Sequence, residues 1–197
     1  MHIALSCVAG ISLGVVSWQL AVWCGEISQK SKRYKAAIVY AQKLGKPLLV
    51  AGGPWSNRRI RRWMNMPAHG DGDVCLDIER QALGIHPYGV IADVTQIPFC
   101  DKVFGAAFAS HLLEHLPTIE HAKKALVELN RVAEVVFVAY PSRQSVGAWL
   151  HRGHNLWVWQ QDNALYLKQR GNSVSEKRAK YSLIDAVGKE LHDEAAP

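Results

Sequence analysis

Glycines and acidic residues stand directly after three short apolar runs of the sequence. Gly52 and Gly53 follow the first run. Asp77 ends the second run, and Asp93 follows the third. Glycines let a ligand approach the backbone, and a carboxylate at the end of a second strand can accept hydrogen bonds from both ribose hydroxyls. The order of these residues predicts a nucleoside site in which Asp93 or its neighbouring amides meet the base.

A second group of residues, His111, Glu114 and His115, forms the pattern H-x-x-E-H. In inverted zincins two histidines one helical turn apart bind zinc, and the glutamate activates water. Pro117 follows two residues later, and a helix that presents both histidines would end there. Packing or capping at a strand-to-helix junction is the alternative for His115.

The elements that must position these residues alternate along the chain. Short β-branched runs joined by helical stretches predict a doubly wound, mostly parallel α/β sheet. The predicted strands are Lys46 to Ala51, Asp73 to Asp77, Tyr88 to Ala92, Val103 to Ser110 and Glu134 to Tyr140, and the predicted helices are Asn57 to Asn65, Glu79 to Leu83 and Ile119 to Arg131. Ligands of such sheets bind outside the carboxyl ends of the strands.

After Pro141 the alternation of predicted strands and helices ends. Runs at 155–160 and 164–167, with Gln161-Asp162-Asn163 between them, predict a β-hairpin added to the edge of the sheet. His151 and His154 precede this hairpin and could shape a substrate pocket. The charged stretch 173–197 predicts a surface helix or tail.

The segment from Ala92 to Leu116, with the later run Ala125 to Val132, resembles class I S-adenosylmethionine-dependent methyltransferases of the type 11 kind. That family has an acidic residue, then "LPF", an acidic loop, a strand, "LEHL" and a helix ending in "EL-RV". Here the corresponding letters are Asp93, Ile97-Pro98-Phe99, Leu113-Glu114-His115-Leu116 and Glu128-Leu129-Asn130-Arg131-Val132. The resemblance extends over roughly Pro47 to Pro141.

The resemblance implies a Rossmann-like methyltransferase fold, S-adenosylmethionine as cofactor, and methyl transfer to an unidentified acceptor. Asp77 corresponds to the ribose-binding acid, and Ile78 to the residue that packs on adenine. The cofactor-binding residues that it implies are Gly52, Gly53, Asp77, Ile78, Asp93, Val94 and Ser110. His111, at the end of the fourth strand, is the candidate catalytic base.

The glycine motif departs from the family pattern of an acidic residue followed by G-x-G-x-G. Only Gly52 is in register, while Pro54 and Ser56 replace later glycines and Val50 replaces the acid. Pro54 has no N–H to offer. Two alternatives therefore stand beside the enzyme: a catalytically degenerate methyltransferase-fold interaction module, and a zinc hydrolase that uses His111 and His115.

The N-terminal segment contains no charged residue from Ile3 to Gly25. As a helix it would be about 34 Å long, enough to cross a hydrocarbon core. Lysines and arginines follow it at once, which predicts a single-pass anchor with the remaining chain on the cytoplasmic side. Gly10 and Gly14 form GxxxG, a spacing that allows a homodimer through this helix.

Charge divides the chain in the same region. Between Ile27 and Gly70 there are ten Lys and Arg residues and no Asp or Glu, whereas the net charge of the whole chain is +6. Such a block favours an anionic membrane surface as partner over nucleic acid, because few aromatic residues are interleaved with it. The predicted division is a transmembrane anchor at 1–27, a basic linker or helix at 28–45, a methyltransferase-like domain at 46–172 and a charged tail at 173–197.

Overall fold

The computed structural model describes residues 2–54, 70–161, 164–171 and 178–182 of the chain. Five parallel strands form one sheet in the order β3-β2-β1-β4-β5. Their bounds are β1 Leu48–Ala51, β2 Val74–Asp77, β3 Gly89–Ile91, β4 Phe104–Ser110 and β5 Ala133–Ala139. The predicted doubly wound parallel sheet is confirmed, because the strand order reverses between β1 and β4. The helix predicted at 57–65 lies outside the described residues.

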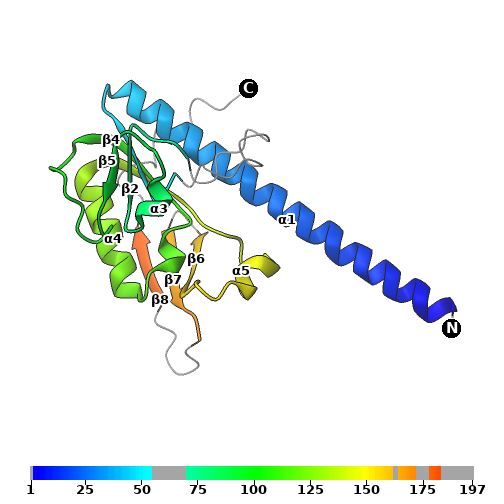
Figure 1. The fold of residues 1–197 in the computed structure, drawn as a ribbon. Helices are drawn as coiled ribbons and strands as arrows, with labels where there is room; N and C mark the ends of the chain where they lie inside the picture. Colours follow the sequence, from blue (N-terminus) through cyan, green and yellow to red (C-terminus); the bar gives the residue numbers. More distant parts are fainter. Residues whose placement is uncertain (1, 55–69, 162–163, 172–177, 183–197) are drawn as a thin grey trace.

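Two helices cover the two faces of this sheet (Figure 1). Helix α4, Ile119–Val132, begins at Thr118, whose side chain accepts a hydrogen bond from the backbone N–H of His121. Its apolar stripe packs against alternate residues of β1 and β4, such as Leu49 and Ala107. The intervening residues of both strands point to the opposite face, which helix α1 covers.

Helix α1, His2–Lys43, is one continuous helix whose N-terminal half projects away from the sheet (Figure 1). Its C-terminal half is seated on the sheet through Tyr34, Ala37 and Ala41. Gly105 of β4 makes this close approach possible, because a Cβ there would lie 2.9 Å from the Cα of Ala41. Nearer the N-terminus of the helix, Glu26 accepts a hydrogen bond from the backbone N–H of Ser142.

The membrane-spanning helix predicted near the N-terminus is not found. Among the described residues, no helix combines the length and the apolar character that crossing a membrane requires.

The predicted hairpin is present, but it does not extend the parallel sheet. Strands β6 Leu156–Gln161 and β7 Ala164–Gln169 pair antiparallel, and β8 Arg178–Ser182 pairs with β7 to form a separate three-stranded sheet. The buried side chains of β6 and β7, including Leu156 and Leu165, join the core that contains α4. Packing against this core places the hairpin apart from the sheet edge. Strand β8 lies inside the segment 173–197, for which a helix or tail is predicted.

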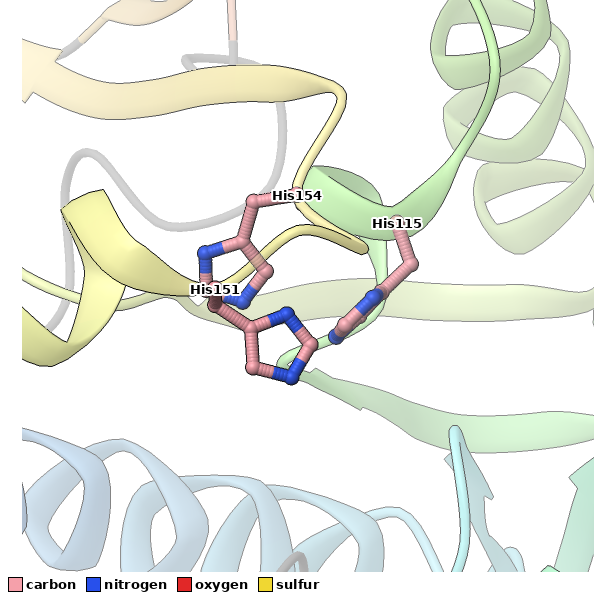
Figure 2. A group of neighbouring side chains, drawn as sticks. All are labelled: His115, His151 and His154. Atoms are coloured by element: carbon pink, nitrogen blue, oxygen red, sulfur yellow. The ribbon is translucent and has the colours of Figure 1, made fainter.

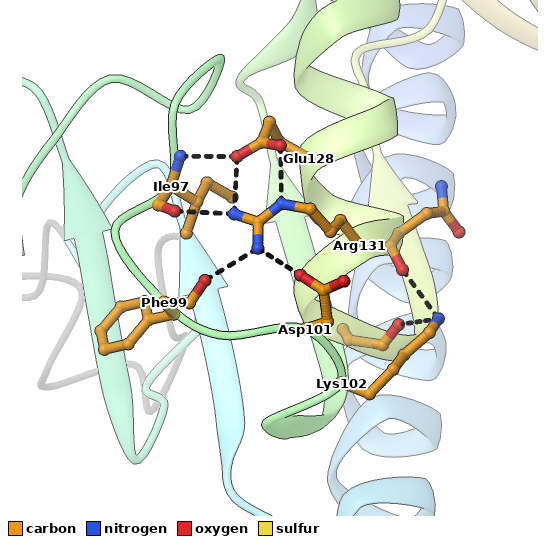
Figure 3. Close-up of polar contacts among 8 residues, drawn as sticks. Ile97, Phe99, Asp101, Lys102, Glu128 and Arg131 are labelled. Atoms are coloured by element: carbon orange, nitrogen blue, oxygen red, sulfur yellow. Dashed lines mark hydrogen bonds and ion pairs between the residues drawn. The ribbon is translucent and has the colours of Figure 1, made fainter.

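The connection from β3 to β4 is fastened to α4 by Arg131 (Figure 3). The guanidinium donates to both carboxylate oxygens of Glu128, to the carboxylate of Asp101, and to the backbone carbonyls of Ile97 and Phe99, all at 2.7–2.8 Å. Glu128 also accepts from the backbone N–H of Ile97. Five donors in one planar group therefore hold the loop that leads away from Asp93.

Candidate functional site

A cleft of about 960 Å³ opens at the carboxyl ends of the parallel strands, where the strand order reverses. Six of the residues that the sequence predicts for the site line this cleft together: Gly52, Asp77, Ile78, Asp93, Val94 and His111. Gly53 and Ser110 are buried and do not contribute to its lining. The position agrees with the general location of ligands in open α/β sheets.

Gly52 forms the floor of the cleft at the end of β1. Its φ is +92°, and its N–H donates to the carbonyl of Leu76 at 2.9 Å. A Cβ at this position would lie 3.1 Å from the carbonyl oxygen of Ser110 and 3.4 Å from the Cβ of Leu112. The turn therefore requires glycine both for its backbone conformation and for its close contact with β4.

Asp77 ends β2 and lies half-buried in the cleft wall. Its Oδ1 accepts a hydrogen bond from the backbone N–H of Glu79 at 2.8 Å. Burial raises the pKa of the Asp77 carboxyl, and the Glu79 hydrogen bond offsets this only in part. A carboxylate that loses hydration in this way gains from a ligand that brings hydroxyl donors to it.

Asp93 follows β3 and also lines the cleft. Its Oδ1 accepts from both the backbone N–H and the hydroxyl of Thr95, each at 2.8 Å. Ile78, which also lines the cleft, is 67% exposed although it is apolar, whereas Val94 is buried. An exposed apolar side chain in a cleft with two acids suits a flat ring whose edges carry polar groups.

His111 stands just after β4 with a φ of +51°, an uncommon backbone conformation for a residue other than glycine. Its N–H donates to the carbonyl of Ala139, and its Nδ1 lies 3.1 Å from Oε1 of Glu114. Glu114 is 1% exposed, and nothing in the described structure hydrogen-bonds its Oε2. A buried carboxylate beside Nδ1 orients the ring and favours a proton on that nitrogen.

The segment around Glu114 does not form the α-helical turn that the zincin pattern requires. Leu113–His115 is a single 3-10 turn, η1, and Leu116 leaves it in an extended conformation. His111 pairs with Glu114, whereas His115 turns to His151 and His154. The histidines of H-x-x-E-H thus belong to two different clusters.

Sequence reasoning did not place His115, His151 and Thr95 around one cleft, although all three line it. The spacing His151-x-x-His154 was visible in the sequence, but its meeting with His115 depends on how the loop before β6 folds back. The backbone N–H of Asn155 donates to the carbonyl of Glu114 at 2.7 Å and fixes this return.

Neither a known protein family nor a characterised protein matches the sequence. The solved structures that are similar to the chain include the following three, all at low identity. The chain is similar to 1,6-didemethyltoxoflavin-N1-methyltransferase of Burkholderia thailandensis, solved with 1,6-didemethyltoxoflavin and S-adenosylhomocysteine, at 9% identity over 92% of this chain and 72% of that one, with a TM-score of 0.37. The PH0226 protein of Pyrococcus horikoshii OT3 is 11% identical over 81% and 76% of the two chains, with a TM-score of 0.41.

The third structure is the N-methyltransferase NodS of Bradyrhizobium japonicum WM9, which is 10% identical over 79% of this chain and 97% of that one, with a TM-score of 0.38. Because these similarities are low, the ligand of the cleft has to be inferred from the residues that line it. The sheet order and the cleft define a doubly wound α/β domain with a cleft where ligands of such domains bind.

Proposed function

We propose that the protein is an S-adenosylmethionine-dependent methyltransferase whose acceptor is unidentified. The observation that carries this proposal is the meeting of Gly52, Asp77 and Asp93 at the ends of three strands around one cleft. Each residue stands at the end of a different strand. Such an arrangement is what a bound nucleoside requires, whereas local packing does not require it.

The residues of the cleft fit such a cofactor. Asp77, whose pKa is raised by burial, would accept hydrogen bonds from the ribose hydroxyls. Ile78 would pack on the adenine ring, and Asp93 with Val94 would meet the edge of the base. When bound, S-adenosylmethionine supplies an electrophilic methyl carbon on a sulfonium group.

The chain's own contribution to the chemistry is mainly to hold donor and acceptor in line. His111 is the candidate for accepting a proton from the acceptor, because it lines the cleft and Glu114 holds its Nδ1. With a proton held on Nδ1, the base in this arrangement is Nε2, and the imidazolium that forms would be stabilised by the Glu114 carboxylate.

The test is isothermal titration of the full chain with S-adenosylhomocysteine, the product that the cleft would release. We expect saturable binding to the unmodified chain and a loss of at least about 10-fold in affinity in Asp77→Asn, equivalent to roughly 1.4 kcal/mol. Asp73→Asn is the matched control, because Asp73 lies at the opposite end of the same strand and bonds only the backbone N–H of Leu48 in the described structure. No heat at millimolar ligand would favour the degenerate interaction module instead.

We also propose that the projecting half of α1 brings the cleft to an anionic membrane surface. Its side chains from Leu13 to Trp23 include six large apolar groups that are about half exposed or more: Leu13, Val15, Val16, Trp18, Leu20 and Trp23. The exposed lysines Lys32 and Lys35 follow on the same helix. Apolar side chains next to basic ones match a bilayer that carries anionic headgroups.

Flotation with vesicles tests this second proposal. We expect the full chain to float with vesicles containing phosphatidylserine, and to float less when residues 1–17, which include Leu13, Val15 and Val16, are removed. Equal flotation of the two chains would contradict it. A homodimer through Gly10 and Gly14 remains a proposal of the same kind, and at Gly14 a Cβ would meet no atom within 4 Å.

A further inference from the structure

Three histidines from two separate segments meet at the rim of the cleft (Figure 2). His115 ends the turn η1, while His151 and His154 lie in the loop between α5, Val146–Leu150, and β6. Their ring centroids lie 4.4–5.4 Å apart. One nitrogen from each histidine lies within 4.8 Å of the other two. Because His151 stacks on His154, the three can share one ion once the exposed His151 ring turns.

Backbone carbonyls fix which nitrogen carries a proton in two of these rings. The Nδ1 of His115 lies 3.0 Å from the carbonyl oxygen of Gly153, and the Nδ1 of His154 lies 3.2 Å from that of Ala148. A carbonyl oxygen only accepts, so each Nδ1 carries a proton, and in the neutral ring Nε2 is the nitrogen that offers a lone pair. This is the orientation that second partners impose on metal-bound histidines.

The third ring, His151, is held differently. Its Nδ1 accepts a hydrogen bond from the backbone N–H of Gly153 at 3.2 Å. A metal would therefore replace this hydrogen bond or require the exposed ring to turn. Four-coordinate zinc holds its nitrogen ligands about 3.3 Å apart, so nitrogens that lie within 4.8 Å of one another would approach by up to about 1.5 Å on binding.

Charges of both signs lie near the three rings. The guanidinium of Arg170 donates to the backbone carbonyls of Ala148 and His151 at 3.0 and 3.1 Å. The buried carboxylate of Glu114, which interacts electrostatically with His154, has an oxygen for which the described residues provide no hydrogen-bond donor. A buried carboxylate behind three imidazole ligands offsets part of the charge of a divalent ion.

We propose that His115, His151 and His154 form a binding site for a divalent transition metal of the zinc class. His115 and His151 also line the cleft, so the fourth ligand position lies on the cleft side, where water or a donor atom of a substrate can occupy it. The site stands on these three histidines and does not depend on methyl transfer.

A second group, Asp71, Cys75 and His86, offers a weaker site although its ligand atoms are equally close. Burial raises the pKa of the Cys75 thiol to about 11, which opposes the thiolate that a metal needs. Both ring nitrogens of His86 already have backbone partners, the carbonyl of Gly72 and the N–H of Tyr88.

The experiment is titration of the metal-free full chain with Zn²⁺, followed by Co²⁺ absorption spectroscopy. We expect about one equivalent of Zn²⁺ per chain, and visible Co²⁺ bands of a four- or five-coordinate nitrogen site without a thiolate charge-transfer band. His151→Ala and His154→Ala should each weaken Zn²⁺ binding by at least about 10-fold. His86→Ala is the matched control and should bind Zn²⁺ as the unmodified chain does.

Because His151 is exposed, its replacement should leave thermal unfolding of the metal-free chain unchanged, which separates loss of the site from loss of the fold. Failure of Zn²⁺ to bind at sub-millimolar concentration would overturn the proposal. So would a thiolate band together with loss of binding in His86→Ala, or Zn²⁺ binding that survives both His151→Ala and His154→Ala.

Discussion

At the scale of single residues, Asp77 lines the cleft although its burial lowers the free energy of unfolding at neutral pH. The folded chain raises the pKa of its carboxyl chiefly by burial, so the folded state holds the proton more tightly than the unfolded state. The free energy of unfolding therefore falls as the pH rises from about 4 through the raised pKa. A residue kept at such a cost is a candidate for ligand binding.

Asp77→Asn removes this titration and keeps an oxygen that can accept from the N–H of Glu79. We expect the variant to be at least as stable as the unmodified chain at neutral pH, and to lack the decline in stability above about pH 4. Urea denaturation from acid to neutral pH measures both. A variant that is clearly less stable at neutral pH would mean that Asp77 has a structural role.

Gly52 is tied to the cleft floor by conformation and by contact. Gly52→Ala should lower the free energy of unfolding by about 1–3 kcal/mol, because a left-handed φ is strained in alanine and the new methyl group meets the carbonyl of Ser110. Gly45→Ala is the matched control, since its φ is +61° but a Cβ there meets nothing within 4 Å. Urea denaturation should show a smaller loss for Gly45→Ala, and equal losses would count against the contact with Ser110.

At the scale of elements, the helix motif "EL-RV" has a structural explanation. Leu129 and Val132 are fully buried under the sheet, while Glu128 and Arg131 hold the connection from β3 to β4. Lys102, at a φ of +53°, donates to the carbonyls of Asn130 and Ala133 at the end of α4 (Figure 3). The motif thus anchors the loop that follows Asp93.

Arg131→Lys keeps the charge but loses the planar fork, so we expect it to destabilise the chain nearly as much as Arg131→Met. Arg131 also lowers the pKa of Glu128 through their hydrogen bonds. The stability that this carboxylate contributes is present above its ordinary pKa and is lost as the pH falls through the lowered value. Acid denaturation followed by circular dichroism should show that the Arg131 variants lose this component, and full rescue by lysine would contradict the role of the fork.

Much of the strand pattern was predictable, because buried parallel strands are continuous apolar runs such as Leu48 to Ala51. The ends of these runs also placed Gly52, Asp77 and Asp93 at one edge of the sheet. The cluster of His115 with His151 and His154 was not predictable, since it depends on how the loop before β6 returns to the turn η1. The prediction that the hairpin joins the edge of the parallel sheet was wrong for a related reason. The alternation of side chains along a strand does not show which core its apolar residues will join.

At the scale of the whole molecule, α1 has two unlike halves. The half that contains Ala37 and Ala41 completes the core on one face of the sheet, whereas the half before Gln19 has exposed side chains from Leu13 to Trp18. Gln19 is the first residue of the helix with a described contact to the rest of the chain, a hydrogen bond from the N–H of Val146.

Removal of residues 1–17 should therefore leave thermal unfolding of the remaining chain unchanged. Ala41→Asp, in contrast, places a carboxylate against the backbone of Gly105 and should prevent stable folding at 37 °C. Calorimetry of the two variants checks this division. A large loss of stability on truncation would show that the projecting half contributes to the core.

The central claim is that the cleft binds the nucleoside of S-adenosylmethionine through Asp77. Thermal unfolding with and without saturating S-adenosylhomocysteine, on the unmodified chain and on Asp77→Asn, tests it most directly, because a ligand raises the stability of the state that it binds. We predict a ligand-dependent rise in Tm for the unmodified chain, and for Asp77→Asn an equal or higher Tm without ligand and little rise with it. No rise in the unmodified chain, or the same rise in Asp77→Asn, would contradict the claim.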